Sequence, residues 1–119
     1  MVIENDDAQR AAVEEVFQNA GYSTISFENG KRALDHLVTT GNRLPDLIVL
    51  DLDLPIVGGW EFLEIVKSYA RLSQIPVIVT GGEPPMILAK DQRVHQAFIA
   101  KPLSASALLD TAEKLVGKP

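Results

Sequence analysis

Two carboxylates, Asp51 and Asp53, are the first candidates for chemistry because they follow the most apolar short run of the chain. That run, residues 47–50, lies between Pro45 and Pro55, and this pattern is typical of a strand buried on both faces. Asp51 is therefore expected where a buried strand emerges into a loop, and burial would make its charge costly unless another group neutralised it. Taken alone, both acids could equally be ordinary turn residues, so the ends of the other strands decide.

The expected strands end in polar groups of complementary kinds, namely Glu4 with Asn5, Asp51, Thr80 and Lys101. The carboxyl ends of parallel strands lie along one edge of an α/β sheet, so these groups should meet there. Carboxylate and amide oxygens suit Mg²⁺, a lysine supplies a point charge for a phosphoryl oxygen, and a threonine hydroxyl can donate a hydrogen bond to another. The set has the parts that phosphoryl transfer needs, with Asp51 as the candidate nucleophile.

Strand and helix patterns alternate along the chain. Short β-rich or apolar runs predict strands over residues 2–3, 22–27, 47–50, 75–79 and 97–100. Apolar residues at helical spacing predict helices within residues 11–20, 33–38, 60–69, 86–92 and 108–116. Asp6 or Asp7 can cap the first helix, and Ser104 or Ser106 the last. The alternation implies an α/β fold with a parallel sheet, right-handed crossovers and helices on both faces.

Length and composition exclude several classes of protein. A chain of 119 residues fits one domain, with residues 117–119 as a linker or tail, and it is either a whole protein or a domain cut from a longer one. The absence of cysteine excludes disulfides, thiolate zinc sites and cysteine nucleophiles. A net charge of −5 argues against nucleic-acid binding by this domain, and no apolar run is long enough to cross a membrane. We expect a cytoplasmic protein that meets other proteins or a cation.

In this order and spacing, the residues resemble a response-regulator receiver domain of two-component signalling over nearly the whole chain. Asp51 matches the phosphoacceptor, with Pro55 four and Gly59 eight residues later, as in the family pattern D-x-x-x-P-x-x-x-G. The family's acidic pair, hydroxyl, switch aromatic and K-P motif are matched by Glu4 with Asn5, Thr80, Phe98 and Lys101-Pro102. We therefore expect a flavodoxin-like (βα)5 fold, a doubly wound five-stranded parallel sheet in the order 2-1-3-4-5.

The resemblance also implies a phosphoryl donor and a metal. A phosphohistidine of a histidine kinase or phosphotransfer protein would donate its phosphoryl group to Asp51. Mg²⁺ would be bound by Asn5, the Asp51 carboxylate and the backbone carbonyl of Asp53, with Glu4 acting through water. The domain would be regulatory rather than an enzyme, although it would assist its own phosphorylation and dephosphorylation.

A switch is implied as well. Thr80 would turn toward the phosphoryl group, and Phe98 would move inward behind it. This movement would change the surface that meets a downstream effector protein or a fused domain. Lys101 would contact the phosphoryl group, and its peptide bond to Pro102 would be cis.

Departures from the family pattern motivate a second interpretation, a pseudo-receiver that binds partners without regulation by phosphorylation. Asn5 stands where an aspartate usually coordinates the metal, so one negative charge is lost and metal affinity should fall. The segment between Thr80 and Lys101 is short and contains Pro84 and Pro85, so the fourth helix should differ from the family norm. Phosphorylation of Asp51 by a small acyl-phosphate donor would separate the two interpretations.

A third interpretation is an enzyme. Asp51-x-Asp53, followed by Thr80 and Lys101, resembles the order of acid pair, hydroxyl and lysine in haloacid-dehalogenase phosphatases. That family carries its acid pair on the first strand and usually has threonine or valine where Pro55 stands. In addition, 119 residues leave no room for a cap domain. Multiple turnover on phosphate esters would support this interpretation.

Overall fold

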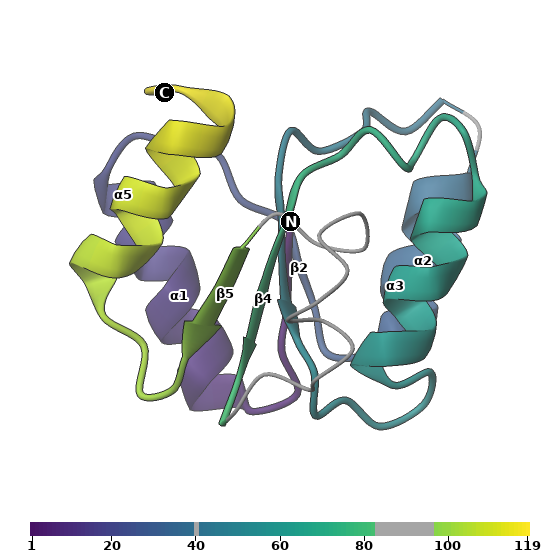
Figure 1. The fold of residues 1–119 in the computed structure, drawn as a ribbon, viewed down its shortest axis with the longest axis horizontal. Helices are drawn as coiled ribbons and strands as arrows, with labels where there is room; N and C mark the ends of the chain where they lie inside the picture. The colour runs from purple at the N-terminus through teal and green to yellow at the C-terminus, as the bar shows by residue number, and fades with distance from the viewer. Residues whose placement is uncertain (40, 83–96) are drawn as a thin grey trace.

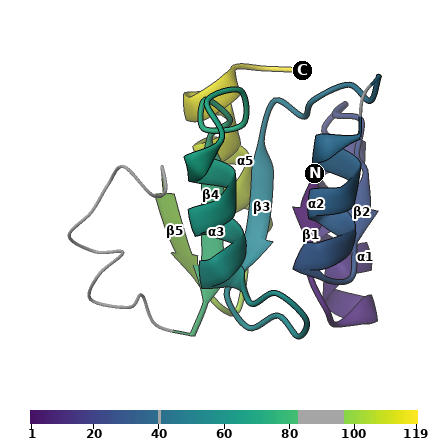
Figure 2. The same ribbon diagram turned by 90° about the vertical axis from the view of Figure 1, so that its right-hand side faces the viewer.

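A computed structural model describes residues 1–39, 41–82 and 97–119, which form a five-stranded parallel sheet between two helical layers (Figure 1). The strands are β1 (Val2–Ile3), β2 (Ser26–Phe27), β3 (Ile48–Asp51), β4 (Val77–Gly81) and β5 (Ala97–Ala100). Their order is β2-β1-β3-β4-β5, which Figure 2 shows from right to left. The fold class and the strand order predicted from the sequence are therefore confirmed.

The helices in the described residues are α1 (Asp7–Asn19), α2 (Gly30–Val38), α3 (Gly59–Ser68) and α5 (Ala105–Val116). Helices α1 and α5 cover one face of the sheet, and α2 and α3 cover the other (Figure 1). Asp6 caps α1 by accepting a hydrogen bond from the Gln9 N–H, and Ser104 caps α5 by accepting one from the Ala107 N–H. The helix predicted within residues 86–92 lies outside the described residues. No described helix has both the length and the apolar character needed to span a bilayer.

Side chains alternate between the two helical layers along each strand. On β3, Ile48 and Leu50 belong to the core beneath α2 and α3, whereas Val49 belongs to the core beneath α1 and α5. All three are buried, as expected for a parallel sheet that is covered on both faces. The position of a residue in its strand therefore decides which helical layer its side chain faces.

Strand β2 is shorter than the sequence pattern predicted. Residues 22–27 alternate as a strand would, but only Ser26 and Phe27 pair with β1, because β1 itself has two residues. Tyr22 instead meets the end of α5, where its hydroxyl donates a hydrogen bond to the Gly117 carbonyl at 2.9 Å. The partner strand, rather than the β propensity of the segment, sets the length of β2.

Candidate functional site

Four predicted site residues lie at the carboxyl edge of the sheet, which is the edge where the parallel strands end. Asp51 and Thr80 are direct partners in the β3–β4 register. Glu4 and Lys101 each follow the last residue of a strand, β1 and β5. Each of the four comes two residues after a side chain that packs beneath α1 and α5. Because side chains alternate along a strand, all four are expected on the face of the sheet that these helices cover.

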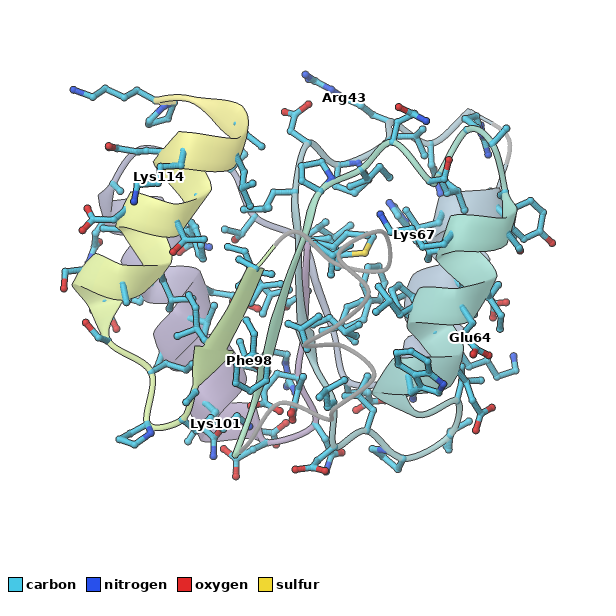
Figure 3. The ribbon with its side chains drawn as sticks, viewed as in Figure 1. Arg43, Glu64, Lys67, Phe98, Lys101 and Lys114 are labelled. Atoms are coloured by element: carbon cyan, nitrogen blue, oxygen red, sulfur yellow. The ribbon has the colours of Figure 1, made fainter. Side chains whose placement is uncertain are left out.

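The Lys101 ammonium joins the two buried carboxylates of this group. Its Nζ lies 3.1 Å from Glu4 Oε1 and 3.3 Å from Asp51 Oδ2. The Glu4 and Asp51 residues are only 5% and 3% exposed, whereas the lysine side chain is 25% exposed. Figure 3 shows Lys101 at the end of β5, below Phe98 in that view. One partly accessible cation therefore lies between two carboxyl groups that are almost fully buried.

The two carboxylates differ in how readily they ionise. Burial raises the pKa of Glu4 to about 7, a hydrogen bond with Asp51 adds to the rise, and Lys101 opposes it. Burial also disfavours ionisation of Asp51, but hydrogen bonds from the Glu4 carboxyl and the Asp53 N–H, together with Lys101, lower the pKa of Asp51 overall. Of the two, Glu4 is therefore the group that holds a proton more readily, and Asp51 is the group that ionises more readily. Asp51 keeps the ionised form that a carboxylate nucleophile needs.

The loop after β3 also orients Asp51. The Asp53 N–H donates a hydrogen bond to Asp51 Oδ1 at 3.1 Å, while Asp51 Oδ2 faces Lys101. The Asp53 residue itself is exposed. Both oxygens of the candidate nucleophile are therefore held by positive or partially positive groups, and a second acid lies at the exposed rim of the site.

The Thr80 hydroxyl is buried beside Asp51 but does not bond to it. It donates instead to the Leu50 carbonyl, at a long distance of 3.4 Å. A weak bond to a backbone carbonyl can be exchanged for a stronger acceptor at low cost. Among the described residues, the Thr80 hydroxyl therefore makes only a weak hydrogen bond.

Phe98 lies on the other face of the sheet from this cluster. It is paired with Val79, and its half-buried ring packs against the core beneath α2 and α3. A Cβ built on Gly81 would lie 3.8 Å from Phe98 Cε2 and 3.7 Å from Leu52 Cδ1. Gly81 therefore lies next to both the aromatic ring and Leu52, the residue that follows Asp51. No pattern in the sequence indicated this arrangement.

Gly59 brings the start of α3 against the end of β3. A Cβ on this residue would lie 2.5 Å from the Asp51 carbonyl oxygen and 2.6 Å from Leu52 Cα, distances that no side chain can occupy. Its N–H donates to the Leu52 carbonyl at 3.3 Å. This close approach gives a physical reason for a glycine eight residues after Asp51.

The oxygen donors at the carboxyl edge fit a hard cation such as Mg²⁺. Asp51 supplies an ionised carboxylate, and Asn5 begins the exposed loop between β1 and α1. Within the described residues, no three or more His, Cys, Asp and Glu side chains are grouped as metal ligands. Any magnesium ion at this edge would combine the Asp51 carboxylate with neutral oxygen donors, for which the Asn5 amide oxygen and the Asp53 backbone carbonyl are candidates.

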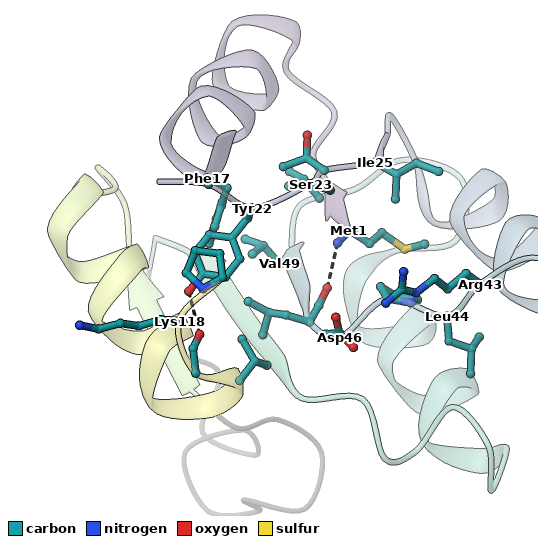
Figure 4. A pocket seen from close by; sticks show the side chains of 18 of the residues that line it. Met1, Phe17, Tyr22, Ser23, Ile25, Arg43, Leu44, Asp46, Val49 and Lys118 are labelled. Atoms are coloured by element: carbon teal, nitrogen blue, oxygen red, sulfur yellow. Dashed lines mark hydrogen bonds between the residues drawn. The ribbon is translucent and has the colours of Figure 1, made fainter. Parts of the chain in front are cut away.

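A separate hollow of about 670 Å³ opens at the amino edge of the sheet, where the strands begin (Figure 4). Its lining includes the apolar residues Phe17, Ile25 and Val49 and the charged residues Arg43 and Asp46. None of the predicted site residues is among the described residues that line it. The cluster with the chemistry and this cavity thus lie at opposite edges.

Known proteins resemble the chain over nearly its full length. Residues 1–113 match the family described as response regulator receiver domain. The polar-differentiation response regulator DivK of Brucella anthropi is 30% identical, and the match covers 98% of this chain and 94% of DivK.

Solved structures share the fold. The receiver domain of a signal transduction histidine kinase from Syntrophus aciditrophicus is 26% identical with a TM-score of 0.83, covering 97% of this chain and 86% of that one. The chemotaxis protein CheY4 of Vibrio cholerae has a TM-score of 0.84 at 22% identity, over 96% of this chain and 94% of that one.

Proposed function

Because the chain belongs to the response regulator receiver domain family, we propose that it accepts a phosphoryl group on Asp51 and thereby switches a surface that contacts other proteins. The donor is a phosphohistidine on a histidine kinase or phosphotransfer protein, and the receiver of the signal is an effector protein or a fused domain. The observation that carries this proposal is the Lys101 ammonium, which lies within 3.3 Å of both buried carboxylates. We place the domain in the cytoplasm and regard it as regulatory.

The residues can divide the chemistry as follows. An ionised Asp51 oxygen attacks phosphorus, the bond from phosphorus to the donor's imidazole nitrogen breaks, and that nitrogen keeps the electron pair. The product is an acyl phosphate on Asp51. Lys101 offsets charge on the phosphoryl oxygens. Asn5, Asp51 and the Asp53 carbonyl would hold Mg²⁺, with Glu4 acting through water, and the ion would supply further neutralisation of charge.

The switch uses the Thr80 hydroxyl and the Phe98 ring, and both change position on phosphorylation. The Thr80 hydroxyl leaves the Leu50 carbonyl for a phosphoryl oxygen, which is a charged and stronger acceptor. Phe98 then moves inward past Gly81, where the absence of a side chain leaves room for the ring. The movements of Thr80 and Phe98 near the phosphorylated Asp51 thus change the protein surface near β5.

Incubation with acetyl phosphate and Mg²⁺, read by intact mass, tests the proposal. Wild type should gain one phosphoryl group, and Asp51→Asn should gain none. Asp53→Asn is the matched control, because it removes the exposed neighbouring acid and leaves the nucleophile. Phosphorylation of both wild type and Asp51→Asn would contradict the assignment of Asp51.

The pseudo-receiver is the second candidate, and Asn5 is the observation that favours it. With an amide at this position, Lys101 is paired with two carboxylates, and the described residues contain no group of three or more His, Cys, Asp and Glu side chains that could hold a metal. A wild type that folds but gains no phosphoryl group would support this candidate. The phosphatase interpretation has no such support, because Asp51 ends β3 rather than the first strand.

A further inference from the structure

Arg10 connects the first turn of α1 to the end of β1. Its Nη1 donates a hydrogen bond to the Glu4 carbonyl at 3.0 Å, and its Nη2 contacts Asp7 Oδ1 at 2.6 Å. The arginine side chain is 21% exposed, whereas that of Asp7 is 88% exposed. An exposed ion pair contributes little by itself. The bond to the backbone carbonyl is the contact that can matter for the site.

The Glu4 residue is held on three sides. Its N–H donates to the Phe27 carbonyl of β2 at 3.1 Å, its side chain accepts from Lys101, and its carbonyl accepts from Arg10. The Glu4 carbonyl and the Asn5 N–H belong to one planar peptide unit. Arg10 therefore fixes the direction in which the chain leaves β1 and enters the loop that carries Asn5.

Asn5 depends on this support. The residue is exposed, and within the described part of the chain its side chain makes no hydrogen bond. The position of its amide oxygen is therefore set by the backbone. A ligand must be held within a fraction of an ångström to bind a metal well, and the residues that orient ligands contribute strongly to affinity.

We infer that Arg10 is a positioning residue of the proposed phosphoacceptor site, because it holds the Glu4–Asn5 peptide and so fixes the backbone that carries the Asn5 side chain. This inference rests on the proposed function. A purely electrostatic role makes the opposite prediction, since a cation near the site would repel Mg²⁺. The two explanations can therefore be separated by the sign of a change in affinity.

Titration with Mg²⁺ alone, followed by the fluorescence of the single tryptophan Trp60, provides the test. Arg10→Gln should weaken Mg²⁺ binding roughly 10-fold. Arg10→Lys should fall between this variant and wild type, because a lysine keeps the charge but lacks the planar fork with which the guanidinium reaches both acceptors. Arg32→Gln is the matched control, since it makes the same change in charge at an exposed ion pair between Arg32 on α2 and Glu28, which precedes that helix.

A milder variant, Asp7→Asn, guards against misfolding of Arg10→Gln. A second measurement, made without metal, tests the position of the loop directly. Asp7→Asn removes only the outer partner of Arg10 and should weaken Mg²⁺ binding in the same direction by a smaller factor. In the metal-free protein, the ¹⁵N order parameter of the Asn5 amide should fall in Arg10→Gln and stay unchanged in Arg32→Gln.

Tighter Mg²⁺ binding by Arg10→Gln, or an Asn5 order parameter that does not change, would overturn the inference. If wild type bound no Mg²⁺, the proposed metal site would fail, and the Asn5 order parameter would still decide whether Arg10 holds the loop.

Discussion

Lys67 and Lys101 are both half-buried lysines, but they meet different partners at opposite edges of the sheet (Figure 3). The Lys67 ammonium donates to the Ser73 and Ile75 carbonyls, at 3.2 and 3.4 Å, near the start of β4. Burial lowers the pKa of Lys67. Burial would also lower the pKa of Lys101, but its hydrogen bond to Glu4 and the charge of Asp51 raise it instead.

The comparison shows that burial alone does not make a lysine functional. Carbonyl oxygens satisfy the donors of Lys67 without offering a charge to neutralise, so this residue supports the chain that leads into β4. Carboxylates hold the Lys101 ammonium beside Asp51, where its positive charge can offset the negative charge of an incoming phosphoryl group.

Replacing each lysine by methionine is the strongest test of this contrast. Lys101→Met should slow phosphorylation of Asp51 by acetyl phosphate about 100-fold, because a charge aimed at the reacting group is lost. Lys67→Met should leave the rate within about twofold of wild type, because its contacts are remote from the reaction. Intact-mass time courses measure both rates. Equal losses in the two variants would show that Lys101 acts only through stability.

The close packing at the carboxyl edge can be tested through its glycines. Gly59→Ala should lower the free energy of unfolding by about 2 kcal/mol, because its Cβ would overlap the Asp51 carbonyl and Leu52 backbone. Gly82→Ala is the control, since no atom of the described residues, its chain neighbours aside, lies within 4 Å of a Cβ at that position. Urea denaturation gives both values. A stable Gly59→Ala variant would mean that α3 can shift away from β3.

The raised pKa of Glu4 predicts a dependence of stability on pH. A carboxyl group with a raised pKa in the folded state contributes stability below its ordinary value of 4.5, and loses that contribution as the pH rises to about 7. Wild type should therefore lose stability over this range relative to Glu4→Gln. Thermal unfolding at several pH values measures the difference, with Glu64→Gln on the surface of α3 as the control. Parallel pH profiles for wild type and Glu4→Gln would contradict the prediction.

Introducing an acid at position 5 should change Mg²⁺ affinity at the carboxyl edge, and this effect is the smallest of the four. Asn5→Asp should increase Mg²⁺ affinity roughly 10-fold, because a charged oxygen replaces an amide oxygen as a ligand. Asn19→Asp makes the same change at the exposed end of α1 and should have no effect. Trp60 fluorescence during Mg²⁺ titration measures both. Unchanged affinity in Asn5→Asp would place residue 5 outside the metal site.

The sequence was sufficient to predict the arrangement of the sheet and the meeting of the strand ends. Apolar runs that stop at Asp51 and Thr80 could be read directly, because the polarity change marks the point where a buried strand emerges. The length of β2 could not be read in this way, since it depends on pairing with a two-residue β1.

Other features of the site depend on contacts that no local pattern encodes. The raised pKa of Glu4 arises from burial and from Asp51, a residue that is forty-seven positions away in the chain. The bond from Arg10 to the Glu4 carbonyl involves a backbone atom, which has no signature in the residue types. The glycine at position 59 could be noticed from its spacing, but the reason for it is visible only in the packing of α3 on β3.

The alternation of side chains along the strands has a consequence for how this protein can change in length. Inserting or deleting one residue within β3 or β4 would rotate Asp51 or Thr80 to the opposite surface of the sheet, away from Lys101. Length changes in a connecting loop do not alter which surface of the sheet Asp51 and Thr80 face. Natural and engineered variants that keep phosphoacceptor chemistry should therefore carry their insertions outside the strands.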